Sequence, residues 1–183
     1  MARPVWSRGW RAVERVLDGV AAVERWVCAA LLVVIFAAAT AQVFMRYVMS
    51  APLAASDEVA RFTLIWVTFL AAALTQNRDE HIAVLIIRAR GGAKRRAVLH
   101  ALANVVALLT AVLVVYLGIE TMDRSARVTS PSLEISMSLV YLSVVLGFLL
   151  IALHSVRNLV NLARYGKVSR DAGEHLADEM QLT

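Results

Sequence analysis

The sequence predicts an all-α integral membrane protein with four transmembrane helices. Of its 183 residues, 60% are hydrophobic and 18% are charged, and the mean hydropathy is +0.66. A soluble domain has about 45–50% apolar residues. Four stretches free of Asp, Glu, Lys and Arg supply much of the excess, at 26–45, 62–77, 97–119 and 135–156. Since about 20 apolar residues cross a bilayer as a helix, each stretch predicts one span.

The second stretch is the shortest of the four. Residues 62–77 would rise only about 24 Å as an α-helix, less than the apolar thickness of a bilayer. A start at Ser56 removes this deficit, provided that the Arg61 side chain extends toward the headgroups. The second span is therefore predicted at 56–77, and the membrane domain at 26–161.

Lysine and arginine predict the orientation of the chain. The segment 1–25, the second loop and the segment after the fourth span hold 15 of these residues, whereas the first and third loops hold 4. Cytoplasmic segments carry the excess of positive charge in membrane proteins. Both termini are therefore predicted in the cytoplasm, with 162–183 as a cytoplasmic tail. The net charge of +5 needs no nucleic acid as partner, because the basic stretch 94–96 can face anionic lipid headgroups.

Two further helices are predicted at the membrane surface. Within 1–25, apolar residues recur at helical spacing between charged ones, which predicts an amphipathic helix leading into the first span. After the second span, residues 81–90 are apolar but too few to cross, and Gly91 follows them. They predict a helix lying flat on the inner surface; the alternative is that the second span continues beyond the headgroups.

Residues with catalytic or transport chemistry are scarce. The polar residues in the stretches are a few hydroxyls and the side chains Gln42, Gln76, Asn77, Asn104, His100 and His154. No metalloprotease, phosphate-loop or serine-hydrolase motif is present in the sequence, and Cys28 is its single cysteine. We therefore expect no enzymatic activity and no cofactor, and an accessory rather than a transporting role.

His100 and His154 leave one alternative open. Each lies at the cytoplasmic end of its predicted span, His100 four residues after Arg96 and His154 three before Arg157. Two histidines at similar depth in a helix bundle can be the axial ligands of a haem. A b-type cytochrome subunit is therefore one alternative function, and an autonomous small channel or exporter is another.

Small residues recur at intervals of four in two spans. Ala103, Ala107 and Ala111 do so in the third, and Ala37 and Ala41 in the first. Such positions allow helices to approach closely in lipid. They indicate either packing within this chain or docking against another membrane subunit.

Charges cluster at the start of the second span. Ser56 is expected to cap the helix, with Asp57 and Glu58 in the first turn, where the helix dipole favours negative charge. Arg61 can pair with either acid on one face, and Arg46 can reach the cluster across a short loop. The cluster is expected either to stabilise the helix start or to contact a partner at the outer surface.

Five motifs occur in a recognisable order: QVFMRY at 42–47, SDEVARF at 56–62, WVTFLAAA at 66–73, EHIAV at 80–84 and YLSVVLGF at 141–148. Their order resembles that of the DctQ-like small membrane subunits of tripartite ATP-independent periplasmic (TRAP) transporters. The resemblance covers roughly 26–161.

This resemblance implies a non-catalytic scaffold in the bacterial inner membrane. It implies a large multi-span partner that performs sodium-coupled symport, and a periplasmic binding protein that delivers a carboxylate-type solute. The small and large subunits would form a heterodimer.

The motif positions carried over from the family are few. Arg46, Glu58 and Arg61 match its charged positions, and His81 and Ile82 match the motif after its second span. Departures from the pattern are Leu85, where an acid is common, and Ser136 and Val145, where prolines are common. The fourth helix is therefore expected to be straighter.

Overall fold

The computed structural model describes residues 7–51, 54–77 and 93–165, and it is helical over most of that length. Four long helices follow one another, and each is long and apolar enough to cross a membrane. They are α1 (Ser7–Tyr47), α2 (Ala54–Asn77), α4 (Ala93–Arg124) and α5 (Met137–Tyr165). The fold class predicted from hydropathy is thus confirmed in its helical character and in its four spans.

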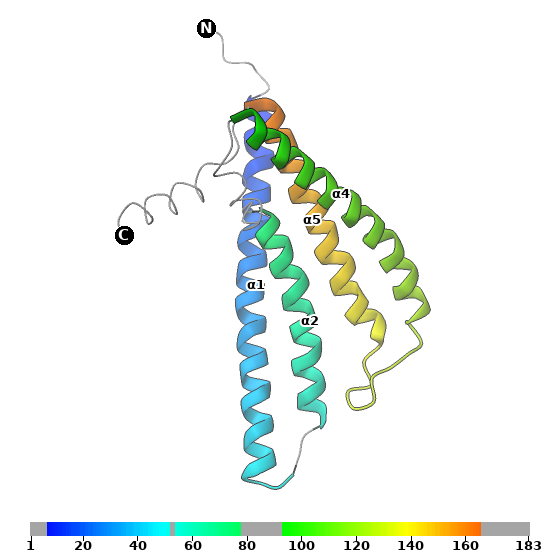
Figure 1. Cartoon of the computed structure of the whole chain (residues 1–183). Coiled ribbons are helices and arrows are strands. Elements are labelled where there is room, and N and C mark those ends of the chain that lie inside the picture. Colours follow the sequence, from blue (N-terminus) through cyan, green and yellow to red (C-terminus); the bar gives the residue numbers. More distant parts are fainter. Residues whose placement is uncertain (1–6, 52–53, 78–92, 166–183) are drawn as a thin grey trace, which may run out of the picture.

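The helices form an open row rather than a closed bundle. In the row, α1 packs on α2, α2 on α5, and α5 on α4, so that α1 and α4 lie at its edges. The helices converge where α1 begins and α5 ends, and they spread toward the α1–α2 and α4–α5 connections (Figure 1). We call the first of these the terminal end and the second the loop end.

Close approach between helices depends on two glycines of this row. A Cβ at Gly147 of α5 would lie 2.6 Å from the Cβ of Phe69 on α2 and 2.9 Å from its carbonyl oxygen. A Cβ at Gly118 of α4 would lie 2.8 Å from a methyl carbon of Val145 on α5. Glycine therefore sets the α2–α5 and α4–α5 distances near the middle of the helices, as small residues do in membrane proteins.

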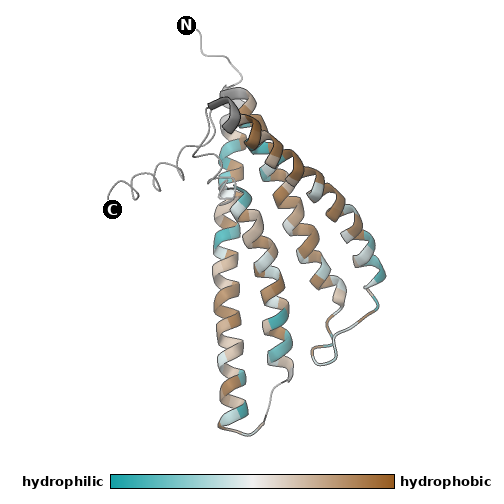
Figure 2. Cartoon of the chain, in the orientation of Figure 1, coloured by the Kyte–Doolittle hydropathy of each residue, from teal (hydrophilic) through white to brown (hydrophobic). Residues whose placement is uncertain are grey.

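The packed interior contains more polar than apolar side chains. The buried apolar side chains are Leu17, Ala21, Cys28, Leu70, Ala73, Ala111 and Val145. Most large apolar side chains instead lie on the outer faces of the helices, and hydrophilic residues concentrate toward the helix ends (Figure 2). This pattern is the reverse of a soluble protein, and it suits helices surrounded by lipid or by another membrane subunit.

Helix bounds differ from the predicted spans mainly at the terminal end. The first span was predicted at 26–45 after a separate amphipathic segment, but Ser7–Tyr47 is one uninterrupted helix. Helix α4 begins four residues before the predicted 97 and ends at Arg124, while α5 runs nine residues past the predicted 156. Charged residues ended the predicted spans, whereas a helix continues wherever backbone hydrogen bonds and packing allow.

The prediction that Ser56 caps α2 is wrong. The helix begins at Ala54, and the Ser56 hydroxyl donates a hydrogen bond to the carbonyl oxygen of Ala38 on α1, at 2.7 Å. Ser56 therefore joins the two helices instead of ending one. The surface helix predicted at 81–90, with His81 and Ile82, lies outside the described residues, as does most of the predicted tail.

Candidate functional site

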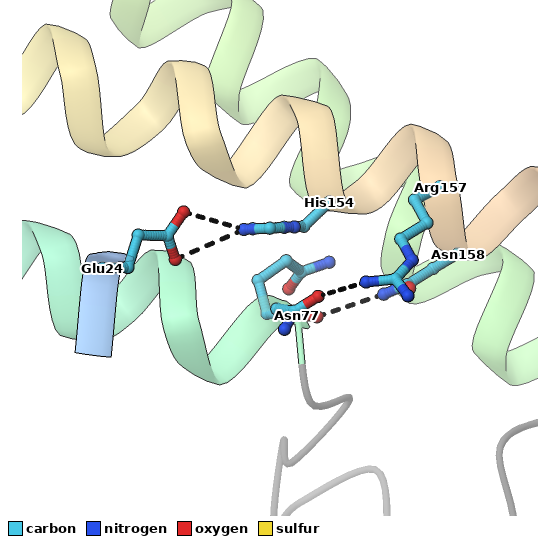
Figure 3. A network of polar contacts seen from close by, with 6 residues as sticks. Glu24, Asn77, His154, Arg157 and Asn158 are labelled. Atoms are coloured by element: carbon cyan, nitrogen blue, oxygen red, sulfur yellow. Dashed lines mark hydrogen bonds and ion pairs between the residues drawn. The ribbon is translucent and has the colours of Figure 1, made fainter. Parts of the chain in front are cut away.

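A cluster of polar side chains joins all four helices at the terminal end. We call it the terminal cluster. Its residues are Asp18 and Glu24 on α1, Gln76 and Asn77 on α2, His100 and Asn104 on α4, and His154, Ser155, Arg157 and Asn158 on α5. Figure 3 shows part of it. These are the polar groups that bring together helices far apart in the row.

Glu24 and His154 form the most deeply buried pair. Glu24 is 4% exposed and His154 is fully buried, and His154 Nε2 lies 3.1 Å from Glu24 Oε1 (Figure 3). Few backbone contacts otherwise join α1 to α5, since α1 packs mainly on α2. This pair therefore fixes α1 to α5. Leaving either group buried without the other would be costly.

Gln76 lies at the centre of the cluster. Its Nε2 donates to Asn104 Oδ1 and to Ser155 Oγ, both at 2.9 Å. Asn158 donates from Nδ2 to the Gln76 carbonyl oxygen at 3.1 Å, and Asn104 donates from Nδ2 to the His100 carbonyl oxygen at 3.0 Å. One amide side chain from α2 thus binds both α4 and α5. Such mutually satisfied amides rigidify a buried contact.

Arg157 closes the cluster toward solvent. Its guanidinium donates to Asn77 Oδ1 at 2.8 Å (Figure 3). It also donates to Asp18 Oδ1 at 2.7 Å, and Asp18 is largely exposed. The Asp18–Arg157 ion pair is a second connection between α1 and α5. It lies nearer the surface than Glu24–His154, so screening by water makes it the weaker of the two.

The contacts of the two histidines do not support the haem alternative. His154 Nε2 is hydrogen-bonded to Glu24, and His100 Nε2 lies 3.3 Å from Asn104 Nδ2. A haem ligand presents an imidazole nitrogen to iron, whereas these nitrogens face protein side chains. Among the described residues, no three His, Cys, Asp or Glu side chains are grouped so that they could hold a metal ion. The contacts favour a structural role for both histidines.

The second polar region lies at the loop end, where Glu58 of α2 binds the connection between α4 and α5. We call it the loop-end corner. Glu58 is buried and accepts hydrogen bonds from the backbone N–H of Ser132, at 3.1 and 3.3 Å, and of Leu133, at 3.0 Å. A carboxylate that accepts two backbone N–H groups makes charge-assisted bonds, which are stronger than neutral ones.

The α4–α5 connection is folded so that it can offer these donors. Thr129 and Ser136 form an antiparallel bridge, and Ser130 N donates to the Ile135 carbonyl oxygen at 2.9 Å. Glu134 has a positive φ of 53°, which lets the chain reverse within the loop. The backbone N–H groups of Ser132 and Leu133 at its tip then point at Glu58.

The charges predicted at this corner divide into three groups. Asp57 pairs with Arg61 at 2.8 Å on an exposed face, as one of the two predicted pairings required. Glu58 binds the loop instead of Arg61. Arg46 is exposed, with its Cζ 5.8 Å from the ring centroid of Tyr47, and the described contacts do not join it to the two acids.

The alanines of α4 do not share one environment. Ala111 is fully buried inside the chain, in keeping with the extensive packing of α4 on α5. Ala103 and Ala107 are half-buried, and Ala37 and Ala41 on α1 are exposed. Internal packing therefore accounts for Ala111, while docking by the others stays a prediction.

The buried pair that sequence reasoning missed is Glu24–His154. The first predicted span began after Arg25, so Glu24 was assigned to a surface segment. A signal was present, because Leu17, Ala21, Glu24 and Cys28 follow one another at intervals of three and four and share one helix face. All four are buried. An acid on the packed face of a helix indicates a partner elsewhere in the fold.

The fold and both polar regions define a multi-pass α-helical membrane subunit, built from two helical hairpins that polar contacts join at each end. The chain matches the family model of the tripartite ATP-independent periplasmic transporters, DctQ component, over residues 35–165. Since the match covers more than half of the chain, the protein belongs to this family. It is thus a small component of a TRAP transporter and a multi-pass inner-membrane protein. A comparison with curated proteins finds no match.

Proposed function

We propose that this protein is the non-catalytic scaffold subunit of a TRAP transporter. It would support a large membrane subunit that takes up a carboxylate-type solute together with sodium, after delivery by a periplasmic binding protein. The observation that carries the proposal is the distribution of polar groups. The stretches 26–45, 62–77, 97–119 and 135–156 contain no Asp, Glu, Lys or Arg, and within them the hydroxyls of Thr68, Thr75 and Ser143 bond to carbonyl oxygens of their own helices. Such spans support packing rather than ion passage.

The terminal end is proposed to face the cytoplasm. Helix α1 begins and α5 ends at this end, α4 begins there with the basic stretch 94–96, and positive charge accumulates on the cytoplasmic side of membrane proteins. The loop-end corner then faces the periplasm, where the binding protein docks. Glu58 would shape that surface by holding the α4–α5 connection against α2, and Asp57 and Arg61 would add exposed charges beside it.

Association tests the proposal first. The tagged chain is purified in mild detergent from its native membrane, and the proteins that accompany it are identified by mass spectrometry. We expect one multi-span membrane protein in equal amount. Recovery of the chain alone, or with redox proteins and a haem absorption band, would contradict the scaffold function.

Uptake into liposomes tests the division of labour. Vesicles with this chain alone should show no solute flux, and vesicles with the large subunit, this chain and the binding protein should take up solute when sodium is supplied outside. Flux through the chain alone would favour an autonomous channel or exporter. Equal uptake without this chain would show that the large subunit needs no scaffold.

Two substitutions test the proposed contacts. Glu58→Lys should reduce uptake while the chain still inserts, because a lysine cannot accept the N–H groups of Ser132 and Leu133. Ala107→Leu should lower the yield of the complex if the half-buried face of α4 contacts the large subunit. Unchanged uptake, or unchanged yield, would remove the corresponding contact from the proposal.

A further inference from the structure

Two rows of residues at helical spacing run along α1, and we call each row a seam. The first seam is covered by α2 and, at the terminal end, by α5. The covered seam has intervals of three and four residues and consists of Leu17, Ala21, Glu24, Cys28, Leu31, Ile35, Ala38, Gln42 and Met45, all buried or half-buried. It faces α2 along the membrane section and His154 of α5 at the terminal end. This seam is the internal contact already described.

The second seam is equally regular, and within residues 7–51, 54–77 and 93–165 no other helix covers it. It consists of Val13, Val16, Val20, Val23, Val27, Ala30, Val34, Ala37, Ala41 and Phe44, at strictly alternating intervals of three and four residues. All but Val20 are exposed; Val16 is 66% and Val23 is 63% exposed. Alternating intervals of three and four are the heptad pattern by which one helix packs along another. The ten positions are uniformly apolar over about 46 Å of helix.

Lipid cannot cover the whole of this seam. Exposed Trp26 and Tyr47 are separated by about 31 Å of helix, which matches the apolar thickness of a bilayer, and aromatic residues favour its two boundaries. Beyond Trp26, exposed charges at Arg15, Asp18 and Arg25 keep α1 out of the hydrocarbon. Val13, Val16 and Val23 therefore continue the seam into the headgroup region and the water. A partner that covers both sections must be a protein helix.

A second copy of α1 fits the seam poorly. In a symmetric pair, each residue of the seam faces its own copy. Ala30, Ala37 and Ala41 would then form narrow layers, while Val34 and Phe44 would form wide ones along the same straight helix. Close packing instead requires large side chains opposite small ones. A different helix packs closely along the seam when its large apolar side chains face the alanines.

We propose that the uncovered seam of α1 binds a helix of the large membrane subunit, one that continues past the membrane boundary at the terminal end. This inference rests on the proposed function, since it assigns the scaffold's partner to one helix face. It places that contact on an edge of the helical row, on the side of α1 away from α4 and α5 as the structure describes them (Figure 1). The partner helix would be apolar along the bilayer and would stay apolar toward α1 beyond it.

Site-specific photocrosslinking tests the seam in the assembled complex. Cys28→Ala removes the single cysteine, and Val16→Cys, Val23→Cys or Ala37→Cys then introduces one seam position at a time. Each thiol receives a benzophenone maleimide before illumination. Ala22→Cys and Ala29→Cys are matched controls, because both are exposed on another face of α1. We expect adducts with the large subunit at the three seam positions and no such adducts at the two control positions.

Charge substitution gives an independent readout. Val16→Glu with Val23→Glu should lower the yield of the complex about tenfold or more, because each buried unpaired carboxylate costs more than the 1.4 kcal/mol of a tenfold change in affinity. Ala22→Glu should leave the yield unchanged. Seam adducts between two copies of this chain, equal adducts at the controls, or lipid adducts alone in an intact complex would overturn the inference. If the large subunit does not accompany the Cys28→Ala chain at all, the proposed function itself fails.

Discussion

The two ends of the molecule are held together by different means. At the terminal end, side chains bond to side chains across four helices, and the Glu24–His154 pair is shielded from solvent. At the loop end, a single carboxylate binds the backbone of a loop, and the neighbouring Asp57–Arg61 pair is exposed. The first arrangement depends on the identity of both partners. The second depends on Glu58 and on the shape of the loop.

This difference separates buried charged groups, which stabilise the fold, from exposed ion pairs, which contribute little to its stability. Exposed ion pairs contribute about 0–1 kcal/mol, whereas breaking a buried pair by removing one partner costs about 3–5 kcal/mol. The spread of the helices has the same origin, because the terminal cluster joins all four of them and Glu58 joins α2 to one connection (Figure 1). Substitutions at the two ends should therefore have unequal effects.

The largest effect is expected for His154→Leu. It leaves Glu24 buried without its partner, so the free energy of unfolding should fall by about 3–5 kcal/mol. The measurement is the thermal unfolding midpoint of the purified chain in detergent. Arg25→Gln is the control, because Arg25 directly follows Glu24 in α1 and its side chain is exposed.

The double variant Glu24→Leu with His154→Leu should recover much of that loss. Two apolar side chains leave no buried polar group without a partner at this contact, and such replacements of a buried pair are often neutral or stabilising. If His154→Leu alone unfolds at the same temperature as the control, the terminal cluster does not hold α1 to α5.

A smaller loss of stability is expected for a substitution at the α2–α5 contact, which lies between the terminal end and the loop end. Gly147→Ala would place a Cβ 2.6 Å from Phe69 Cβ and 2.9 Å from its backbone oxygen, so α2 and α5 must move apart. Such overpacking costs about 1–3 kcal/mol and should lower the unfolding midpoint. Gly19→Ala is the matched control: nothing lies within 4 Å of its Cβ position, so helix propensity should stabilise that variant slightly. Equal midpoints for the two variants would show that the helices have room to separate.

A local effect is expected for Glu58→Gln. The amide keeps the shape of the side chain but removes its negative charge and one of its two acceptor oxygens, so the bonds from the N–H groups of Ser132 and Leu133 lose their charge assistance. Amide hydrogen exchange in the α4–α5 connection should accelerate while the helices stay protected. Unchanged exchange at Ser132 and Leu133 would show that the loop keeps its position without Glu58.

The smallest effect is expected for Asp57→Asn. Its partner Arg61 is exposed, and an i,i+4 pair on a helix surface contributes about 0.3–0.5 kcal/mol. The unfolding midpoint should shift by less than the shift caused by Gly147→Ala, and added salt should remove the difference from the unsubstituted chain. A large, salt-independent loss would place Asp57 in a buried contact and remove the contrast between the two ends.

The spans could be predicted because hydropathy acts over whole segments. Three of the four charge-free stretches lie wholly within one helix of the structure, and the fourth, 135–156, begins two residues before α5. The ends of the helices were harder to predict from the sequence, because a helix does not stop at the first charged residue. Arg25 ended the first stretch, yet α1 continues to Ser7 and carries Glu24 on its packed face. The rule that identified the span thus concealed the buried acid beside it.

Whether a polar contact could be predicted depended on how far apart its two residues lie in the sequence. Asp57 and Arg61 are four residues apart, so their pairing follows from helix geometry alone. Glu24 and His154 are separated by 130 positions, and nothing local connects them. Glu58 binds backbone N–H groups, which every residue except proline carries, so the sequence does not distinguish its partners.

The separation between Glu24 and His154 also matters during biosynthesis. At about 5–20 residues per second, a ribosome needs roughly 7–25 s to add the 130 residues between them. For that time α1 is already made while the imidazole that pairs with its acid does not yet exist. A chain that stops before α5 keeps Glu24 without its partner. The pair can therefore form only after His154 of α5 has been synthesised.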